Sequence, residues 1–554
     1  MKEVFALNKL FGRHLVILLL LVTVAAQFLP TPALAAPKPK NVIVLMVDGS
    51  GATHTTVSRW YKGKPLAMEE IVVGSVRTYS AESLITDSAP ASTAFATGNK
   101  SNSKFIGVLP VRAGMPDVAF AEELKYQPVA SVLEGAKLAG KSTGLIATSN
   151  IQHASPAGYS SHNHNRGDYN DIAEQQVNLN IDVVFGGGKQ YLLPKSQGGV
   201  RTDGENLIEV LKSRGYDFVE TREQLLAVKN KKVWGMFAED AMAYDFDRVQ
   251  LQPQEPSLAE MTQKAIDILA KNDKGFFLFV EGSKVDWASH ANDPVGVISD
   301  VLAFDDAVKT ALDFAKKDGN TLVLAFSDHG NGGMSLGNKS TDKNYDTLPY
   351  SALVSPLRKA MLTGEGIEKM LAGNRSEANI RDIMEKYFGI ADLTTDEITT
   401  MQKAKKGEMN YAVGPMISKR SVIGWTTNGH TGEDLFMYGF GPGAPKGTIE
   451  NTDIAKISAK GLGVELASTT KRLFVEADKA FAAIGAKTEI DQSNKENPRL
   501  VVTKGNVRAE LPFSTNTIII DQRTKQMEGL TIFTAKLGKV YVPMQAVELV
   551  KAAL

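Results

Sequence analysis

Residues 276–290 read FFLFVEGSKVDWASH and residues 321–330 read TLVLAFSDHG, and these two stretches decide the fold. Each begins with a short apolar run, which is typical of a strand buried on both faces of a sheet. Gly319 follows the intervening segment at a place where a left-handed residue would end a helix. One apolar stripe at helical spacing lies between the two runs: Val301, Phe304, Val308, Leu312 and Ala315. The segment therefore predicts a strand, a crossover helix and a second, parallel strand.

The same pattern extends outward from this unit in both directions. Asn41–Val47 (NVIVLMV) and Ser142–Thr148 (STGLIAT) are similar apolar runs, and Leu435–Phe440 (LFMYGF) is a later one. Helical segments alternate with them, as in chains that place helices on both sides of a mostly parallel sheet. We therefore predict an α/β fold, a three-layer αβα sandwich around such a sheet.

Residues 331–420 interrupt this rhythm. They contain a loop rich in Gly, Asn and Lys, followed by helical patches near Ile367–Leu371 and Glu377–Tyr387. We predict that this segment is an insertion that forms a crown or lid over one end of the sheet.

The last part of the chain has a different pattern, with short strand-like runs about ten residues apart. They are Leu500–Thr503, Thr517–Ile520, Leu530–Phe533 and Val540–Val542. This predicts a small accessory β domain over residues 490–554, after a large α/β domain over residues 37–489. The small segment resembles the copper amine oxidase-like N-terminal domain, an accessory module of secreted bacterial proteins. It has no His or Cys, so the resemblance implies no copper, and packing or surface attachment is the simpler role.

The first 36 residues have the pattern of an export signal. Lys2, Lys9 and Arg13 precede the apolar run 15–29, and the small residues 33–36 follow it. An uncleaved membrane anchor is the alternative, although the run is short for a span that needs about 20 residues. We therefore expect a mature protein that is secreted, periplasmic or held at the cell surface.

Composition limits the chemistry that the chain can use. Lys+Arg and Asp+Glu are equal at 62 each, so bulk charge gives no reason to expect nucleic acid or an anionic membrane as a partner. The chain has no Cys, and any metal must be bound by carboxylates, hydroxyls and imidazoles.

Polar motifs follow the predicted strands, where open α/β sheets place their ligands. Asp48 follows the first strand, and Glu281 follows FFLFV. Asp286 and His290 are four residues apart, so one helical turn puts both side chains on one face, a spacing that suits zinc. The remaining motifs are the pair Asp328-His329 after TLVLAF and His430 in TNGHTGED.

Two further motifs supply hydroxyl groups and an arginine. Ser88 opens the small-residue run SAPASTAFATG, where a helix N-terminus would favour both an alkoxide and the phosphate that it attacks. Ser155 and Arg166 lie in HASPAGYSSHNHNR, and an arginine can bind two phosphate oxygens at once. Alone, each motif also fits a cap, a turn or a solvated loop.

In combination and order, these motifs resemble the alkaline phosphatase family over residues 37–485. The resemblance implies that Ser88 is the nucleophile, with a phosphoserine intermediate, and that Arg166 binds the phosphate. It implies one zinc ion held by Asp286, His290 and His430, and a second held by Asp48, Asp328 and His329 with the Ser88 oxygen. A third ion, magnesium with cobalt as the alternative, would be bound by Asp48, Ser155 and Glu281.

Two positions near the third ion vary within the family. His153 stands where members have Asp or His, and Trp287 where they have Lys, His or Trp. Ser155 replaces a common Thr and keeps the hydroxyl. The histidines at 54, 162 and 164 match no ligand position and are expected to be ordinary loop residues. Relatives are often homodimers, which makes a homodimer an expectation here as well.

Other enzyme families share this kind of sheet and metal-binding edge and are alternatives to this function. Ser92 stands where the sulfatase signature needs Arg, and cofactor-independent phosphoglycerate mutases need an Asn-Ser nucleophile motif in a cytosolic protein. A phosphodiesterase with the same metals is the nearest enzymatic alternative. An inactive surface-binding protein that acts through its C-terminal module is the alternative of another class. Small phosphomonoesters are the expected substrates, and the natural one is not readable from the sequence.

Overall fold

The computed structural model describes residues 38–553. The predicted export signal over residues 1–36 lies outside the described residues. Among the residues described, no helix is both long enough and apolar enough to cross a membrane.

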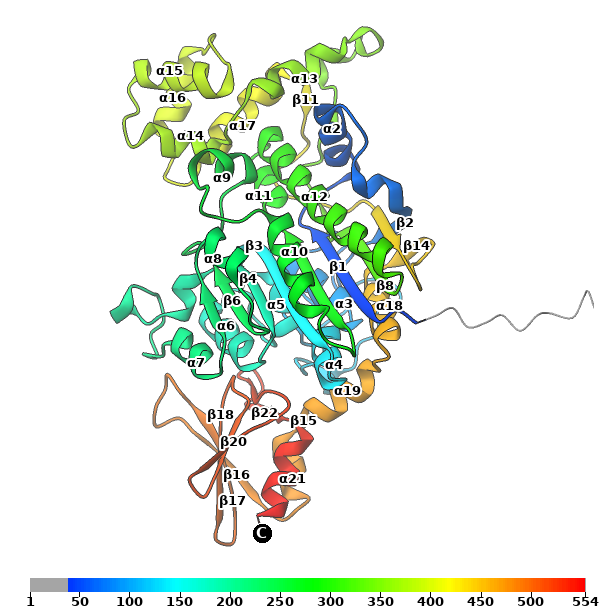
Figure 1. Cartoon of the computed structure of the whole chain (residues 1–554), viewed down its shortest axis with the longest axis vertical. Helices are drawn as coiled ribbons and strands as arrows, with labels where there is room; N and C mark the ends of the chain where they lie inside the picture. Colours follow the sequence, from blue (N-terminus) through cyan, green and yellow to red (C-terminus); the bar gives the residue numbers. More distant parts are fainter. Residues whose placement is uncertain (1–37, 554) are drawn as a thin grey trace, which may run out of the picture. The chain divides into compact units, whose positions relative to one another are not determined.

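A ten-stranded sheet forms the centre of the structure (Figure 1). Strand β1 (Asn41–Val47) lies between β7 (Phe276–Gly282) and β8 (Thr321–Ser327) and is parallel to both, in agreement with the predicted mostly parallel sheet. Strand β13 is antiparallel to its two neighbours, β8 and β2, so the sheet is mixed but mostly parallel. In spatial order the strands are β14 (Gly447–Glu450), β2 (Val72–Arg77), β13 (Leu435–Phe440), β8 (Thr321–Ser327), β1 (Asn41–Val47), β7 (Phe276–Gly282), β3 (Ser142–Asn150), β4 (Val183–Gly187), β6 (Val233–Met236) and β5 (Asp217–Val219).

Helices cover both faces of this sheet because successive side chains of a strand point to opposite faces. In β1 the side chains of Ile43 and Leu45 belong to one hydrophobic core and those of Val42 and Val44 to the other. The first core includes residues of α2 (Ala52–Lys62), α8 (Arg222–Ala227), α10 (Leu258–Leu269) and α12 (Pro294–Asp318). The second includes residues of α3 (Ser88–Thr97), α4 (Val132–Leu138), α5 (Ala154–Ser160), α6 (Tyr169–Asn178), α7 (Leu207–Ser213) and α18 (Asn451–Leu462). The predicted three-layer αβα sandwich is confirmed.

Helix α12 is the predicted crossover between β7 and β8. Asp293 caps its start by accepting a hydrogen bond from the Val295 N–H at 2.9 Å. Gly319 ends it in the left-handed conformation, with φ of 73°. All five residues of the predicted apolar stripe are buried. This unit therefore folds as its sequence pattern indicates.

Five helices lie within residues 331–420, where an insertion was predicted. Helices α14 and α15 coincide with the two predicted helical patches. Lys284, fully buried in α11 (Lys284–His290), forms a salt bridge of 3.0 Å with Glu365 of this segment. The five helices are α13 (Tyr350–Lys359), α14 (Gly364–Leu371), α15 (Glu377–Phe388), α16 (Thr395–Lys403) and α17 (Met409–Arg420).

The C-terminal part contains two antiparallel sheets. One has the order β16 (Lys487–Asp491), β17 (Arg499–Lys504), β18 (Val507–Pro512), β19 (Thr517–Ile520) and β20 (Arg523–Gln526). The other has the order β15 (Val475–Glu476), β22 (Lys539–Val542) and β21 (Ile532–Thr534).

These sheets confirm the predicted β character of this part, but a helix that was not predicted follows them. Residues Met544–Ala552 form helix α21, which buries Ala546 and Val550 against the sheets. Ala546 and Val550 are four residues apart, which is a helical spacing. The helix was not predicted because a series of strand-like runs precedes these residues in the sequence. The domain boundary at residue 490 stays a prediction, although β16 already pairs with β17 from Lys487 onward.

Candidate active site

Three adjacent strands bring the acidic motifs to one edge of the central sheet. Asp48 directly follows β1, Glu281 lies near the end of β7, and Asp328 directly follows β8. The strands are parallel neighbours in the order β8, β1, β7, so their carboxyl ends meet at one edge. Residues almost 300 positions apart in the sequence thus share one site.

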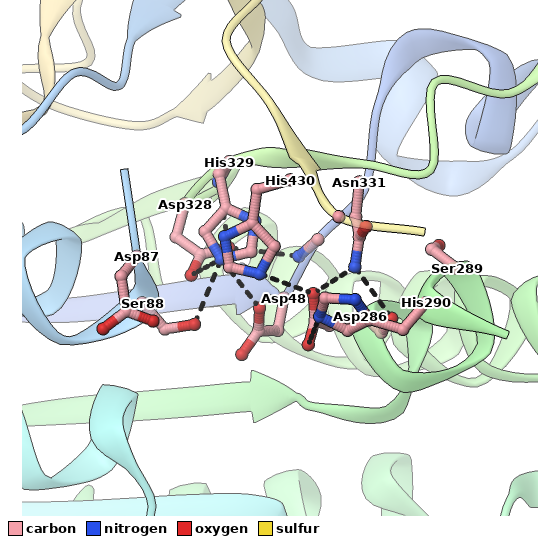
Figure 2. A network of polar contacts seen from close by, with 12 residues as sticks. Asp48, Asp87, Ser88, Asp286, Ser289, His290, Asp328, His329, Asn331 and His430 are labelled. Carbon is pink, nitrogen blue, oxygen red and sulfur yellow. Dashed lines mark hydrogen bonds and ion pairs between the residues drawn. The ribbon is translucent and has the colours of Figure 1, made fainter. Parts of the chain in front are cut away.

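The first group in this site is formed by Asp48, Asp328 and His329, whose side chains have no exposed surface. The Nε2 atom of His329 lies 3.4 Å from Asp48 Oδ1 and 3.1 Å from Asp328 Oδ2. The Oγ atom of Ser88 is 3.0 Å from the same nitrogen. Figure 2 shows these side chains converging from separate elements.

The second group is formed by Asp286, His290 and His430. One turn of α11 places His290 Nε2 3.4 Å from Asp286 Oδ2. His430, in β12 (His430–Thr431), has its Nε2 atom 3.5 Å from Asp286 Oδ1. The Nδ1 atoms of the two histidines lie against the backbone carbonyls of Asn428 and Thr86, at 2.5 and 2.8 Å. Because a carbonyl only accepts, each Nδ1 donates, and each Nε2 faces Asp286 with a free lone pair.

A third group surrounds the other side of Asp48. Ligand atoms of Asp48, His153 and Glu281 all lie within 4.8 Å of one another. The hydroxyl of Ser155 is fully buried nearby and has no hydrogen-bond partner. Trp287 packs edge-on against His153, with 6.0 Å between the ring centroids.

These groups leave several buried polar atoms without a protein hydrogen-bond partner. They are both oxygens of Asp48, both of Glu281, Asp328 Oδ2, Ser155 Oγ and His153 Nδ1. Buried carboxylates without partners are unstable unless a cation or a proton compensates them. A set of carboxylates, imidazoles and hydroxyls is also what Zn²⁺ and Mg²⁺ bind in proteins. The residues present therefore fit bound metal ions.

The electrostatics of the site support the same interpretation. Burial, followed by the charge of Asp328, raises the pKa of Asp48 well above its usual value. Burial also raises the pKa of Glu281 to about 8. Burial acts to lower the pKa of His329, but Asp328 raises it to about 9. These shifts have the direction expected of closely spaced, buried carboxylates, whose charge a divalent cation would balance.

Ser88 is the first residue of α3, as its sequence predicted. Its side chain is 2% exposed, and its neighbours along the helix are small. Ser88 therefore lies in the first turn of α3, where the helix dipole favours negative charge. This is a suitable place for an activated hydroxyl and a phosphate group.

Arg166 lies on the loop between α5 and α6, with its guanidinium directed at the site. Its Nη1 donates to Asp87 Oδ1 at 2.6 Å, and its Nη2 lies 3.1 Å from His153 Nε2. An arginine can only donate, so His153 Nε2 accepts and the ring hydrogen sits on Nδ1. Burial, followed by the charge of Arg166, lowers the pKa of His153 to about 3, so its ring is neutral.

Two partners within the site were not predicted from the sequence. Asn331 donates from Nδ2 to Asp286 Oδ1 at 2.6 Å, and its only sequence signal is its position two residues after His329. Asp87, seen in the sequence only as the neighbour of Ser88, forms the ion pair with Arg166.

The expectation that three histidines are ordinary loop residues is wrong for His54, which lies in a helix, and His162 lies in a loop but is buried there. His54 lies in α2, is 2% exposed, and its Nε2 is 3.0 Å from the Ser289 hydroxyl. His162 is 3% exposed, and its Nε2 is 3.1 Å from Glu134 Oε1. Both are structural residues whose polar partners come from distant parts of the chain. Such partners leave no trace in local sequence.

A further acidic group lies outside the site. Carboxylates of Glu174, Asp203 and Glu205 come within ligand distance of one another. The guanidinium of Arg201 already lies among them, 3.5 Å from Glu174 and 4.0 Å from Glu205, and it also pairs with Asp203. Because the Arg201 guanidinium already lies among these carboxylates and pairs with them, we assign no metal ion to the group.

Several known proteins are similar to this chain over most of its length. The sequence model of the family described as Alkaline phosphatase matches residues 39–464. Alkaline phosphatase 3 of Bacillus subtilis is 37% identical over 446 residues, which cover 76% of this chain and 89% of that protein. The crystal structure of Thermus thermophilus alkaline phosphatase has a TM-score of 0.68 at 25% identity and covers 77% of this chain and 92% of its own.

A third similar structure contains a metal ion. It is a variant of the alkaline phosphatase from the Antarctic bacterium TAB5 with Mg bound in a site named M3. Its TM-score is 0.56 at 26% identity, with coverage of 78% of this chain and 99% of its own. The chain therefore belongs to the alkaline phosphatase family, whose members are metal-dependent phosphoric monoester hydrolases.

Proposed function

We propose that this protein is a secreted alkaline phosphatase that hydrolyses small phosphomonoesters through Ser88 and a phosphoserine intermediate. The observation that carries the proposal is the position of the Ser88 hydroxyl, 3.0 Å from His329 Nε2 at the border of the buried carboxylates and imidazoles. The family and its phosphomonoesterase activity rest on the comparisons, whereas the roles of individual residues rest on this geometry.

Three metal sites follow from the three groups of side chains. Asp286, His290 and His430 would hold one zinc ion. Asp48, Asp328 and His329 would hold the second, with Ser88 beside it. Asp48, Ser155 and Glu281 would hold magnesium, with cobalt as the alternative, and His153 and Trp287 would border that site. When bound, the ions lower the pKa of a nearby hydroxyl and balance the charge of phosphate oxygens.

The protein's own residues account for the other parts of the reaction. The Ser88 oxygen attacks phosphorus, a Ser88 O–P bond forms, and the bond from phosphorus to the leaving alcohol breaks. Water then attacks the phosphoserine, which restores the Ser88 hydroxyl and releases inorganic phosphate. Backbone N–H groups at the start of α3 face the phosphate oxygens. The guanidinium of Arg166 can bind two of these oxygens once it leaves His153.

The location and partners of the protein are further parts of the proposal. The signal-like pattern of residues 1–36 supports export, followed by a periplasmic, released or surface-bound location. The C-terminal segment, which resembles the copper amine oxidase-like N-terminal domain, is a candidate for surface attachment. A homodimer stays a prediction that rests on the family resemblance.

Replacing Ser88 with Ala tests the central claim. We expect Ser88→Ala to lower turnover of p-nitrophenyl phosphate by about a thousandfold or more, since the nucleophile is removed. Bound zinc, measured by elemental analysis, should stay close to the wild-type content. Ser92→Ala is the matched control, because Ser92 lies one turn later in α3 and its hydroxyl bonds only a backbone carbonyl, that of Ala89 at 2.8 Å.

Three results would contradict the proposal. A Ser88→Ala variant with wild-type turnover would exclude Ser88 as the nucleophile. Faster hydrolysis of bis(p-nitrophenyl) phosphate than of the monoester would favour a phosphodiesterase. No hydrolysis of either ester by the zinc- and magnesium-loaded wild type would favour a binding protein.

A further inference from the structure

We propose that Ser514, in the C-terminal module, is a positioning residue that holds the Arg166 loop in place through Asp171. This inference rests on the proposed role of Arg166 in binding phosphate. It gives the C-terminal module, residues 490–554, a part in the reaction of the large α/β domain. The strand pattern in the sequence of this module does not indicate such a part.

Asp171 is the point where the module meets the loop. The Ser514 hydroxyl donates a hydrogen bond to Asp171 Oδ1. Asp171 Oδ2 accepts two other hydrogen bonds, from Asn163 at 2.6 Å and from Gln175 at 2.9 Å. Burial raises the pKa of Asp171, and Ser514 is the first of the three donors that oppose this rise. The carboxylate therefore depends on a donor from the module to keep both of its oxygens bonded.

Hydrogen bonds lead from Asp171 to the turn of residues 165–168, which carries Arg166. Asn163, held by Asp171, accepts on its own Oδ1 from the Asn165 N–H at 2.8 Å. Asn165 in turn donates to Asp168 Oδ1 at 2.7 Å, across the turn that carries Arg166. The Arg166 N–H donates to the Lys104 carbonyl at 2.8 Å. The turn is thus fixed at both ends, and Asp171 is its anchor on the side of the module.

The conformation of Ser514 indicates that its hydroxyl is held in this place by the structure around it. Its φ is 59°, in the left-handed region that non-glycine residues rarely adopt. Its own N–H donates to the Thr531 carbonyl at 2.8 Å, and its side chain is buried. Such strained residues persist only where their surroundings fix them. Here the fixed backbone directs the hydroxyl at Asp171.

The module is attached firmly enough to act as a support. A separate hydrophobic cluster joins Ala130 of the α/β domain to Leu530, Ile532 and Tyr541 of the module, through Leu473 and Phe474. A second polar contact, from Thr202 to Glu496 at 2.8 Å, lies on the exposed side of the interface. The module therefore cannot move away from Asp171 without opening this apolar interface.

The test uses the full-length, metal-loaded protein and the inhibition constant for inorganic phosphate. Ser514→Gly removes the hydroxyl but tolerates the left-handed backbone. We expect it to weaken phosphate inhibition by about threefold to tenfold, as the loss of one hydrogen bond would. In the Arg166→Ala background the same change should have no further effect, because the loop then carries no guanidinium to position. Thr202→Val is the control, since it removes a module contact that does not reach the loop.

A conservative variant and a second deletion complete the test. Ser514→Asn tolerates the left-handed region and keeps a side-chain donor, so its inhibition constant should lie closer to the wild-type value. Ser514→Ala also removes the hydroxyl, with the added strain of Ala in the left-handed region, and it should weaken phosphate inhibition at least as much as the Gly variant. Unchanged phosphate inhibition after loss of the hydroxyl would overturn the proposal. So would an equal loss in the wild-type and Arg166→Ala backgrounds, or an Asn variant as weak as the Gly variant.

Failure of the underlying function gives a different result. If Arg166→Ala alone leaves phosphate inhibition unchanged, the proposed role of Arg166 is wrong. If Arg166→Ala weakens inhibition but loss of the Ser514 hydroxyl does not, the role of Arg166 stands and only the positioning role of Ser514 is excluded.

Discussion

Asp300 lies on α12 inside the large α/β domain, and its side chain is only 3% exposed. Its Oδ2 accepts one backbone hydrogen bond, from the Asp245 N–H at 3.3 Å. Burial, followed by the nearby charge of Asp245, raises the pKa of this carboxyl to about 7. At the alkaline pH where an alkaline phosphatase works, the folded protein therefore carries a buried negative charge. Asp300→Asn removes this charge and keeps the shape of the side chain.

The sign of the effect follows from proton linkage. Between about pH 4 and pH 7 the unfolded chain has lost this proton and the folded chain still holds it, so stability falls as pH rises. A pKa of about 7 in the folded state, against about 4 when unfolded, corresponds to about 4 kcal/mol of lost stability. About 3 kcal/mol of this loss falls between pH 5 and pH 7. The Asn variant avoids the loss but leaves its own N–H donors poorly paired. That cost is the same at both pH values, so we expect the difference in unfolding free energy between the variant and wild type to be about 3 kcal/mol more favourable at pH 9 than at pH 5.

The assay is denaturant unfolding of the metal-loaded protein at pH 5 and pH 9. The quantity compared is the difference in unfolding free energy between Asp300→Asn and wild type at each pH. Asp313→Asn is the matched control, because Asp313 lies on the same helix with its side chain 58% exposed. The control should give the same difference at both pH values. If Asp300→Asn is no more favourable at pH 9 than at pH 5, the buried carboxyl does not limit stability, and the argument from burial is wrong.

Two other perturbations address the metal sites. Gly49→Ala should lower bound zinc and turnover by at least about tenfold, because a Cβ on Gly49, whose φ is +70°, would lie 2.6 Å from Asp286 Cα. Gly319→Ala is the control, because Gly319 has a similar φ of +73° but nothing lies within 4 Å of an added Cβ. A similar loss of zinc in the two variants would contradict the steric argument. Removing the metal should lower the unfolding free energy by about 3 kcal/mol more at pH 9 than at pH 6. The reason is Glu281, whose pKa is about 8 without a metal ion, so that at pH 9 its carboxylate is charged and has no counter-charge. Equal losses at the two pH values, measured by denaturant unfolding of dialysed and metal-loaded protein, would show that Glu281 is not such a group.

The sheet and its crossover helix were predictable because their signals are local. The runs that became β1, β7 and β8 are apolar at every position, since both faces of these strands are covered. The stripe on α12 and the left-handed Gly319 mark a helix and its end within one stretch of chain. Helix α21 was missed because its short apolar pattern follows a series of strands. Its burial depends on sheets formed by other residues.

The candidate site shows the same difference between features with a local sequence signal and features that depend on distant residues. Ligand types were readable because Asp286 and His290 are one turn apart, and because Asp48 and Asp328 each directly follow a strand. The supporting contacts were not readable, since Asn331 reaches Asp286 across 45 positions and Ser514 reaches Asp171 across 343. No periodicity connects such pairs, which meet only when the chain has packed.

By itself, the sequence determined the layered α/β fold and the set of groups available for chemistry, because hydrophobic periodicity and strand-end motifs act over a few residues. The tertiary structure decided which oxygens of Asp48 and Glu281 stay unpaired, which nitrogen of His153 faces Arg166, and that the C-terminal module contacts the Arg166 loop. These features depend on distances of a few ångströms between distant segments, because hydrogen bonds form only at that range and only packing brings such segments together.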